Sequence, residues 1–269
     1  MAQLVAHLHG MQGVRGSNPL SSTGGRDRTG VPSGCDDRRT ARGAVRKVPA
    51  VTVRPIVIYG EPVLHHPARV VTAFDGLLAR LETDLVDTMR VANGVGLAAN
   101  QIGVDLRVYV FDCPEHRDDP DARVVHGTVV NPVLELTPRK EWERDPDPDD
   151  EGCLSVPGEA FPVARSPWAR VTGVDVRGRP VVFEGRDLLA RCLQHETDHL
   201  DGRVYLDRVA RRDSRQARRA VRDNGWGVSG LAWTPGVDPD PFGHDEHDTD
   251  PDAGGTAGAT DGSASTGSL

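Results

Sequence analysis

Two histidines and a glutamate near residue 195 have the spacing of a metal-binding helix. His195 and His199 are four residues apart, and Glu196 directly follows the first histidine. On a helix, residues four apart lie on one face, one turn above the other. Both imidazoles can then bind one metal ion, with the glutamate beside it as a general base. The alternative is a pair of core histidines whose nitrogens are satisfied by backbone or carboxylate partners.

A catalytic metal needs a third protein ligand, and two cysteines are candidates. On a helix, Cys192 would stand roughly 10 Å from His199 along the axis, with its side chain tilted away from the site. We therefore predict that Cys192 is a small core residue. Cys153 is the better candidate, because its segment Glu-Gly-Cys-Leu-Ser (151–155) is followed by Pro157 and Gly158, which suit a chain brought close to another group. The alternative for Cys153 is a buried apolar cysteine.

A third segment, Gly-Val-Gly-Leu-Ala-Ala-Asn-Gln at residues 94–101, combines small residues with an amide side chain. It is not a phosphate loop, because no Lys-Ser or Lys-Thr follows at the required spacing. The small residues permit close approach to a ligand, and Gln101 offers an amide donor. The alternative is a tight turn between a helix and a strand.

Apolar periodicity places these segments within a mixture of helices and strands. We expect helices at about 74–92, 187–200 and 209–222, and strands at 106–111, 124–136 with a break near Asn131-Pro132, 169–176 and 181–184. Asn93-Gly94 and Gly202 should end the first two helices, and the acidic, Pro-rich stretches 113–121 and 144–150 should be loops. This order predicts an α+β fold, with antiparallel or mixed strands packed around a buried metal-binding helix, plus a C-terminal helix.

Composition limits the partners and the compartment. The 269-residue chain has a formal net charge of −8, and no run approaches the roughly 18 apolar residues of a membrane helix. The N-terminus lacks the basic start and long apolar core of a signal peptide, so we expect a cytoplasmic protein without a membrane partner. The predicted folded part, residues 51–233, holds 24 Lys+Arg against 29 Asp+Glu, which argues against a dedicated nucleic-acid-binding domain and against recognition of a specific nucleic-acid sequence.

The chain divides into three parts by composition. Residues 1–50 are rich in Gly, Ser and Arg without apolar periodicity, so we predict a disordered extension that could reflect an upstream-shifted start. Residues 51–222 should form the catalytic domain. Residues 223–269 should form a mostly disordered, acidic tail rich in Gly, Asp, Ser and Thr, although four apolar residues could fold back on the domain: Trp226, Leu231, Trp233 and Phe242.

Together the three chemistry-bearing segments resemble the signature motifs of the peptide deformylase family. Gly-x-Gly-Leu-Ala-Ala-x-Gln, Glu-Gly-Cys-Leu-Ser and Gln-His-Glu-x-Asp-His-Leu occur in that order at residues 94–101, 151–155 and 194–200. The similarity runs over most of residues 51–212. It implies a metal-dependent hydrolase that removes the N-formyl group from the starting methionine of newly synthesised polypeptides and releases formate.

The resemblance also implies roles for individual residues. Cys153, His195 and His199 would bind one divalent metal ion, and water would take the fourth position, as expected for a catalytic site. Glu196 would take a proton from the attacking water and pass it to the leaving amine. The native ion would be Fe(II) first, with Zn(II) or another divalent ion as the alternative.

Four positions would contact the substrate by the same resemblance. The Gln101 amide and the Leu154 backbone N–H would donate to the oxyanion that develops on the formyl oxygen. Val95 and Gly96 would border the substrate backbone and its methionine pocket. Asp198 and Gln194 would support the metal ligands rather than react, because histidine ligands usually hold a partner at the far nitrogen.

Two features depart from the minimal family pattern. The stretch 157–161, Pro-Gly-Glu-Ala-Phe, lacks an arginine that some members place near the peptide, so the preference for residues after methionine could differ. The predicted helix around residues 208–222 carries seven Arg against one Asp, which indicates a transient contact with ribosomal RNA. The alternative for this helix is a solvated surface.

Two rival functions remain open from the sequence. A zincin-type endopeptidase would share the His-Glu-x-x-His helix but needs a downstream ligand such as Asp207, His244 or His247, and it leaves the Glu-Gly-Cys-Leu-Ser segment unexplained. The second rival is not an enzyme: it is a metal-stabilised binding domain, or a family member whose catalysis has lapsed. A lapsed member should have lost a ligand, Glu196 or Gln101, and all of these are present.

Overall fold

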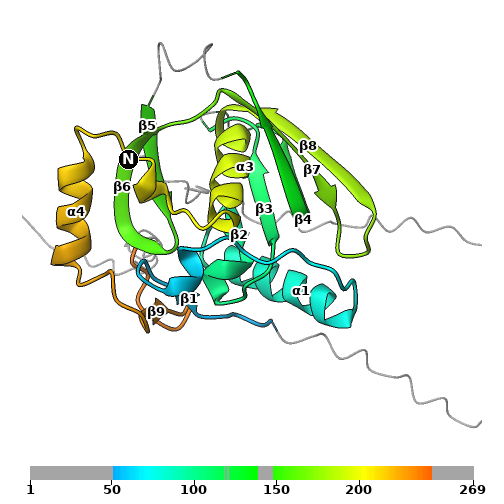
Figure 1. Ribbon diagram of the computed structural model, residues 1–269, viewed down its shortest axis with the longest axis horizontal. Helices are drawn as coiled ribbons and strands as arrows, with labels where there is room; N and C mark the ends of the chain where they lie inside the picture. The colour runs from blue at the N-terminus through cyan, green and yellow to red at the C-terminus, as the bar shows by residue number, and fades with distance from the viewer. Residues whose placement is uncertain (1–50, 118, 120, 139–147, 244–269) are drawn as a thin grey trace, which may run out of the picture.

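The computed structural model describes residues 51–117, 119, 121–138 and 148–243. The predictions for residues 1–50 and for the tail beyond residue 243 lie outside this part of the chain. Figure 1 shows helix α3 (Asp187–Leu200) lying across a twisted sheet, with helix α1 (Gly76–Val91) at one end of it. The predicted α+β class is confirmed.

The main sheet has five antiparallel strands in the order β2-β3-β4-β7-β8. Their bounds are β2 Gly96–Ala98, β3 Val108–Pro114, β4 Val124–Leu136, β7 Trp168–Val174 and β8 Pro180–Arg186. The predicted break in β4 is present as a register shift between Val130 and Val133. Asn131 has a left-handed φ of 53° there, and its amide group pairs with both backbone polar groups of Val71.

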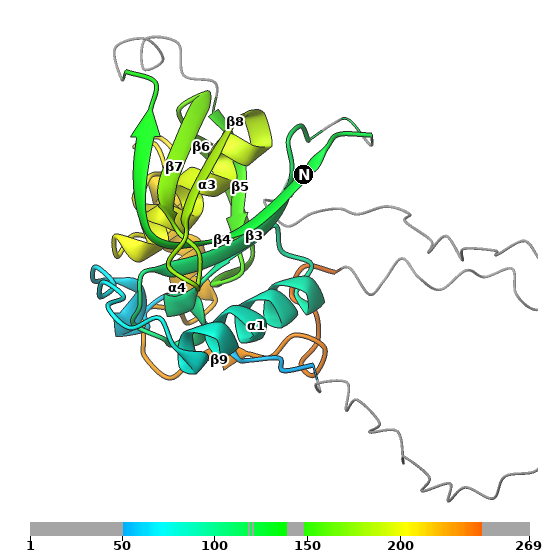
Figure 2. The same ribbon diagram turned by 90° about the vertical axis from the view of Figure 1, so that its right-hand side faces the viewer.

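Both faces of β3 are buried, because its alternating side chains face two different helices. Tyr109 and Phe111 belong to the apolar cluster that includes the inner residues of α3. Val108 and Val110 belong to a second cluster with the inner residues of α1. The sheet edge that carries β2 therefore lies between two packed layers, and Figure 2 shows α1 beneath the strands.

The helices begin and end for local reasons. The carboxylate of Asp75 caps α1 by accepting hydrogen bonds from Leu77 N at 2.9 Å and Leu78 N at 3.2 Å. The chain leaves α1 at Asn93, whose φ is 53°, as the Asn-Gly signal predicted. Helix α3 has the predicted bounds, and Gly202 follows it with φ 74° at a point where a Cβ would lie 2.4 Å from the His66 carbonyl carbon.

The third predicted helix is shorter than expected. Helix α4 spans Ser214–Asp223 instead of beginning at residue 209, because the chain first forms the 3-10 helix η3 (Tyr205–Asp207) and then turns at Ala210. The Ala210 carbonyl accepts from both Asp213 N and Ser214 N at 3.0 Å, which closes that turn.

Two strands were missed by the sequence patterns. The loop predicted at 144–150 is wrong at its end, because Pro148–Cys153 forms β5, and β6 (Val156–Ala164) pairs with it. Both strands contain proline and glycine, so their own propensity for strand is low. Each strand forms because the backbone of the other strand supplies its hydrogen bonds, and no pattern in its own residues indicates this pairing. The predicted loop 113–121 likewise begins inside β3, which runs to Pro114.

The chain beyond residue 222 returns to the domain. Strand β9 (Ala232–Trp233) pairs with β1 (Ile56–Val57) through Ile56–Trp233 and Val57–Ala232. Trp233 is buried and Phe242 packs against the same apolar cluster. The predicted domain end at residue 222 therefore falls short of residues that pack on the domain. Two further 3-10 helices, η1 (Pro62–Leu64) and η2 (Ala99–Ile102), lie near the site. Within the described ranges, no helix has the length and apolar character needed to cross a membrane.

Candidate metal centre and active site

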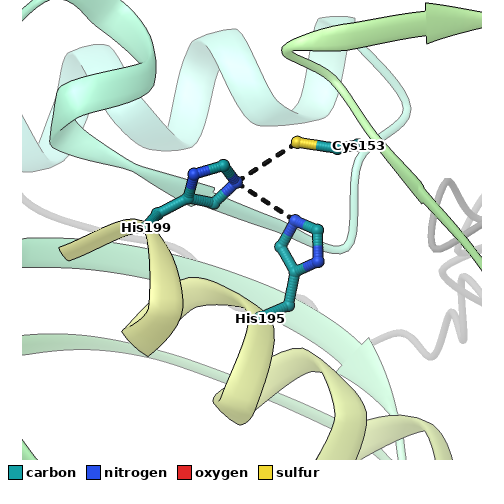
Figure 3. Close-up of side chains that lie close together, drawn as sticks. All are labelled: Cys153, His195 and His199. Atoms are coloured by element: carbon teal, nitrogen blue, oxygen red, sulfur yellow. Dashed lines mark hydrogen bonds between the residues drawn. The ribbon is translucent and has the colours of Figure 1, made fainter. Parts of the chain in front are cut away.

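Helix α3 presents two histidines toward the end of strand β5. His195 Nε2 and His199 Nε2 are 3.1 Å apart, and Cys153 Sγ lies 3.2 Å from His199 Nε2. Figure 3 shows the thiol and the two rings pointing toward one another. The three ligand atoms lie within 4.8 Å of one another, and all three residues are buried.

This donor set fits a divalent metal ion. One thiolate and two imidazole nitrogens are typical ligands of Zn(II) and similar ions, and three protein ligands leave a fourth position open. Lone pairs that face one another in a buried site repel unless a cation or protons lie between them. Cys192 lies in the apolar core, with its thiol 3.6 Å from the Val95 carbonyl oxygen, and is not part of this group.

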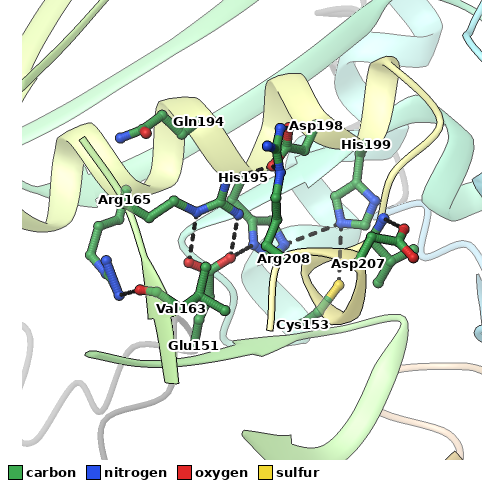
Figure 4. A network of polar contacts seen from close by, with 12 residues as sticks. Glu151, Cys153, Val163, Arg165, Gln194, His195, Asp198, His199, Asp207 and Arg208 are labelled. Atoms are coloured by element: carbon green, nitrogen blue, oxygen red, sulfur yellow. Dashed lines mark hydrogen bonds and ion pairs between the residues drawn. The ribbon is translucent and has the colours of Figure 1, made fainter. Parts of the chain in front are cut away.

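A buried ionic network orients the first histidine (Figure 4). His195 Nδ1 lies 2.7 Å from Glu151 Oε1, so the carboxylate accepts from the ring nitrogen opposite the candidate metal position. Arg165 donates to both oxygens of Glu151, at 2.6 and 3.0 Å, and also to Asp198. Arg208 donates to Asp198 from the other side at 2.5 Å. The network therefore ties β5 and the residue that follows β6 to α3.

The sequence predicted that Asp198 and Gln194 support the candidate metal ligands, but it did not indicate Glu151 and Arg165. Asp198 and Gln194 do not face the ligand group; Gln194 exchanges two hydrogen bonds of 2.9 Å with the backbone of Ser166. Glu151 and Arg165 had no assigned role. The one available signal was a carboxylate two residues before the candidate cysteine, and its partner Arg165 is 14 residues further along the chain.

Burial and neighbouring charges shift the pKa values of the site in opposite directions. Burial by itself would raise the pKa of Glu151, but the Arg165 guanidinium and His195 hold it well below its ordinary value. Burial lowers the pKa of His199, and the neighbouring His195 lowers it further. Burial raises the pKa of Glu196 to about 7, with the Glu151 carboxylate adding to the rise. The site thus holds one ionised carboxylate beside a second one with a much higher proton affinity.

Glu196 lies against the backbone of β2. A Cβ at Gly96 would stand 2.3 Å from Glu196 Oε1, so the missing side chain of this glycine makes room for the carboxylate. Glu196 is 2% exposed, and within the described residues its Oε2 has no hydrogen-bond partner. One carboxylate oxygen is therefore available to a reacting group.

The predicted oxyanion donors, Gln101 and Leu154, line the same cleft as Glu196. Gln101, in η2, accepts from Ala98 N at 2.8 Å, while its Nε2 points toward Cys153 Sγ at 3.5 Å and Ser155 Oγ at 3.3 Å. Leu154 lies in the tight turn between β5 and β6. Across the part of the chain that the structure describes, its backbone N–H donates no hydrogen bond.

Most of the predicted site residues share one small cleft. It is lined by Gly94, Gly96, Gln101, Gly152, Cys153, Leu154, His195 and Glu196. Val95 does not line this cleft: its side chain is buried in the core and its carbonyl accepts from Asp112 N at 2.9 Å. The zincin alternative receives no support from Asp207, whose carboxylate accepts from Val204 N at 3.0 Å, and His244 and His247 lie outside the described residues. Three convergent ligands beside a buried carboxylate, in an α+β fold, define the class as a metal-dependent hydrolase.

Comparison with known proteins narrows this class to one family. The sequence profile of the family described as polypeptide deformylase matches residues 53–215. The peptide deformylase of Mycolicibacterium vanbaalenii is 56% identical over 199 residues, which cover 72% of this chain and all of that protein. The peptide deformylase of Rhodococcus opacus is 52% identical over 196 residues, covering 73% of this chain and all of that protein. A crystal structure of a peptide deformylase from Legionella pneumophila matches with a TM-score of 0.55 and 36% identity, covering 65% of this chain and 96% of the other.

The chain belongs to the peptide deformylase family. It is a hydrolase that removes the N-formyl group from the starting methionine of newly synthesised polypeptides. The function predicted from the three motifs is thereby confirmed, as is dependence on a metal ion; the identity of that ion is a separate question.

Proposed function

We propose that Cys153, His195 and His199 bind the one divalent metal ion on which deformylation depends. The observation that carries this proposal is the convergence of their three ligand atoms within 4.8 Å in a buried site. Glu151 supports it, because its carboxylate fixes the orientation of the His195 ring from the far nitrogen. When bound, the metal ion would act as a Lewis acid that lowers the pKa of water and polarises the formyl carbonyl.

Glu196 is the proton carrier in this proposal. Its unpartnered Oε2 accepts the proton from the attacking water, and the same oxygen then delivers the proton to the amine nitrogen as the C–N bond breaks. A carboxylate whose pKa is raised by burial to about 7 can do both, since it binds the proton at neutral pH without holding it too tightly. Formate and a free N-terminal amine are the products.

The Leu154 N–H and the Gln101 amide stabilise the negative charge that develops on the formyl oxygen. The Leu154 N–H is free of other hydrogen bonds within the described chain. The Gln101 side chain is held by Ala98 N, and its Nε2, which donates to Cys153 Sγ and Ser155 Oγ, would turn one of these hydrogens to the formyl oxygen. One such donor is typically worth about 3–4 kcal/mol of barrier. Gly96, which lines the cleft, and its neighbour Val95 border the substrate backbone in this proposal.

Iron is the metal that we propose for the native enzyme, with Zn(II) or another divalent ion as the alternative. The thiolate and imidazole donors accept either ion, and availability in the cell decides occupancy. Metal analysis of protein purified from its own cells without oxygen distinguishes the two. One iron per chain supports the proposal, and one zinc per chain overturns it.

We also propose a transient ribosome contact through α4, in a cytoplasmic enzyme whose catalytic domain begins near residue 51. Six exposed arginines, four of them on α4 and two just before it, support the contact: Arg215, Arg218, Arg219 and Arg222, with Arg211 and Arg212. Changing Arg215, Arg218 and Arg222 to Gln should abolish co-sedimentation with ribosomes at low salt. Substitution tests this better than truncation at Asp207, because truncation also removes β9. Unchanged co-sedimentation of the triple variant overturns this contact.

The central experiment measures formate release from formyl-Met-Ala-Ser by protein prepared without oxygen, with metal content determined on the same samples. Glu196→Ala should lower the turnover by about 10²- to 10⁴-fold while the metal stays bound. Glu184→Ala on β8, whose side chain is 54% exposed, is the carboxylate control and should retain full turnover. Full activity of Glu196→Ala would contradict the proton-carrier role, and loss of metal from it would place Glu196 among the ligands.

A further inference from the structure

The turn between β5 and β6 is held by residues outside the three chemistry-bearing segments. The Trp233 indole Nε1–H donates to the Leu154 carbonyl at 2.9 Å. The Tyr59 backbone N–H donates to the Ser155 carbonyl at 2.8 Å. Trp233 lies on β9, which pairs with Ile56 on β1 only three residues before Tyr59. Two segments from opposite ends of the domain, joined to each other, therefore anchor both carbonyls of this turn.

The Trp233 side chain is itself firmly placed. It is 7% exposed and lies in the apolar cluster that also contains Leu154 and Met89. Its ring makes an edge contact with Phe242, with ring centroids 5.9 Å apart. The indole N–H is therefore in a fixed position when it meets the Leu154 carbonyl, and the hydrogen bond is shielded from water.

We infer that Trp233 is a positioning residue for the Leu154 N–H. Only two soft torsions separate the N–H of a residue from its own carbonyl. Trp233 anchors the Leu154 carbonyl, which follows this N–H in the chain. The Cys153 thiol, which precedes it, is held among the proposed metal ligands. The Leu154 N–H between them therefore has little freedom to turn. This inference rests on the proposed role of Leu154 as an oxyanion donor. It also extends the working site beyond residue 215, where the match to the family profile ends.

Transition-state stabilisation depends on the direction of the donor, so losing the anchor should affect turnover rather than substrate binding. Trp233→Phe keeps an aromatic ring beside Phe242 and removes the N–H. We expect kcat for formyl-Met-Ala-Ser to fall about tenfold, with KM unchanged within about twofold. The affinity for the product Met-Ala-Ser, which has no formyl oxygen, should stay the same, and so should the metal content.

Trp226→Phe is the matched control, because it makes the same chemical change on the same C-terminal stretch. Within the described chain the Trp226 indole donates no hydrogen bond, and its ring packs beside a different cluster. This variant should retain the parent kcat. An unchanged kcat in Trp233→Phe would overturn the inference, and so would an equal loss in both variants.

A ring isostere covers the case in which Trp233→Phe folds poorly. Benzothienylalanine at position 233 keeps the size and shape of the indole but carries sulfur in place of the N–H, so its packing should be retained. It should show the same tenfold loss of kcat at a parent-like melting temperature, and parent-like turnover would overturn the inference. If the parent protein releases no formate at all, the proposed function is rejected. If the parent is active, Glu196→Ala is inactive and both Trp233 variants keep the parent turnover, this inference alone is rejected.

Discussion

Helix α3 and the β5–β6 turn meet at the same site but are built in different ways. On α3, the relative positions of His195, Glu196 and His199 follow from backbone hydrogen bonds within one helix. The turn carries Cys153 and Leu154, and its contacts come from residues far away in sequence: Gln101 is 52 residues from Cys153, and Trp233 is 79 residues from Leu154. One half of the site is therefore set locally and the other half by the tertiary structure.

The two regions also differ in the kind of interaction that holds them in place. The Glu151–Arg165–Asp198 network joins β5 and the residue after β6 to α3 through buried charges, and each of the three side chains is at most 7% exposed. Such a network is costly to leave half-paired. The turn itself is anchored by neutral hydrogen bonds, each of which is worth about 1 kcal/mol. We expect damage to the charged network to affect folding, and damage to the turn to affect catalysis.

Removal of a proposed metal ligand from either half should have the largest effect. His199→Ala on α3 and Cys153→Ala on the turn should each weaken metal binding by roughly 10³-fold, since a site of this kind is worth about 10–16 kcal/mol shared among its ligands. Chelator competition measures the affinity. Cys192→Ala is the matched control and should keep the parent affinity. A ligand variant with parent affinity would remove that residue from the metal centre.

Breaking the ionic network between the two regions should have the second-largest effect. Glu151→Gln leaves the buried Arg165 with a single carboxylate partner and should lower the free energy of unfolding by about 3 kcal/mol. The less basic amide should also weaken metal binding by about 10- to 100-fold. Urea unfolding and chelator competition measure the two effects. Unfolding at the parent urea midpoint would show that the ionic network does not join the halves.

A change at Gly96 should displace Glu196, the proposed proton carrier, without changing the proposed metal ligands. Its new Cβ in Gly96→Ala would stand 2.3 Å from Glu196 Oε1, so the carboxylate must move. A displacement of about 1 Å can cost on the order of 10² in rate, and we expect a loss of that size in kcat with metal retained. Gly76→Ala, where a Cβ meets open space, is the control. Parent-like kcat in Gly96→Ala would mean that Glu196 tolerates a second position.

The outer end of the network should matter least. Arg208 is 41% exposed at its side chain and pairs with Asp198, which Arg165 already neutralises. Arg208→Ala should cost about 1 kcal/mol of stability or less, because solvent screens the pair, and should change turnover less than about twofold. Thermal unfolding and formate release check both values. If Arg208→Ala lowers the stability as much as Glu151→Gln does, the surface residue Arg208 is an essential part of the network.

Much of the site was readable from local patterns. Helical spacing placed His195, Glu196 and His199 on one face of α3, and axial distance along the same helix argued against Cys192 as a ligand. The bounds of α3 and the end of α1 at Asn93 also followed from periodicity and helix-stop residues. These features depend on neighbours within about one or two turns, which the sequence displays directly.

The tertiary structure alone decided the rest. Strands β5 and β6 consist of acidic, Pro-rich and Gly-containing sequence that becomes a hairpin only because each strand supplies the other's hydrogen bonds. The Glu151–Arg165 pair and the Trp233–Leu154 contact join side chains that no local pattern relates. The sequence by itself therefore determined which groups we propose for the chemistry, because residue types and helical spacing are local. Their orientation required the fold, because the anchoring groups come from distant parts of the chain.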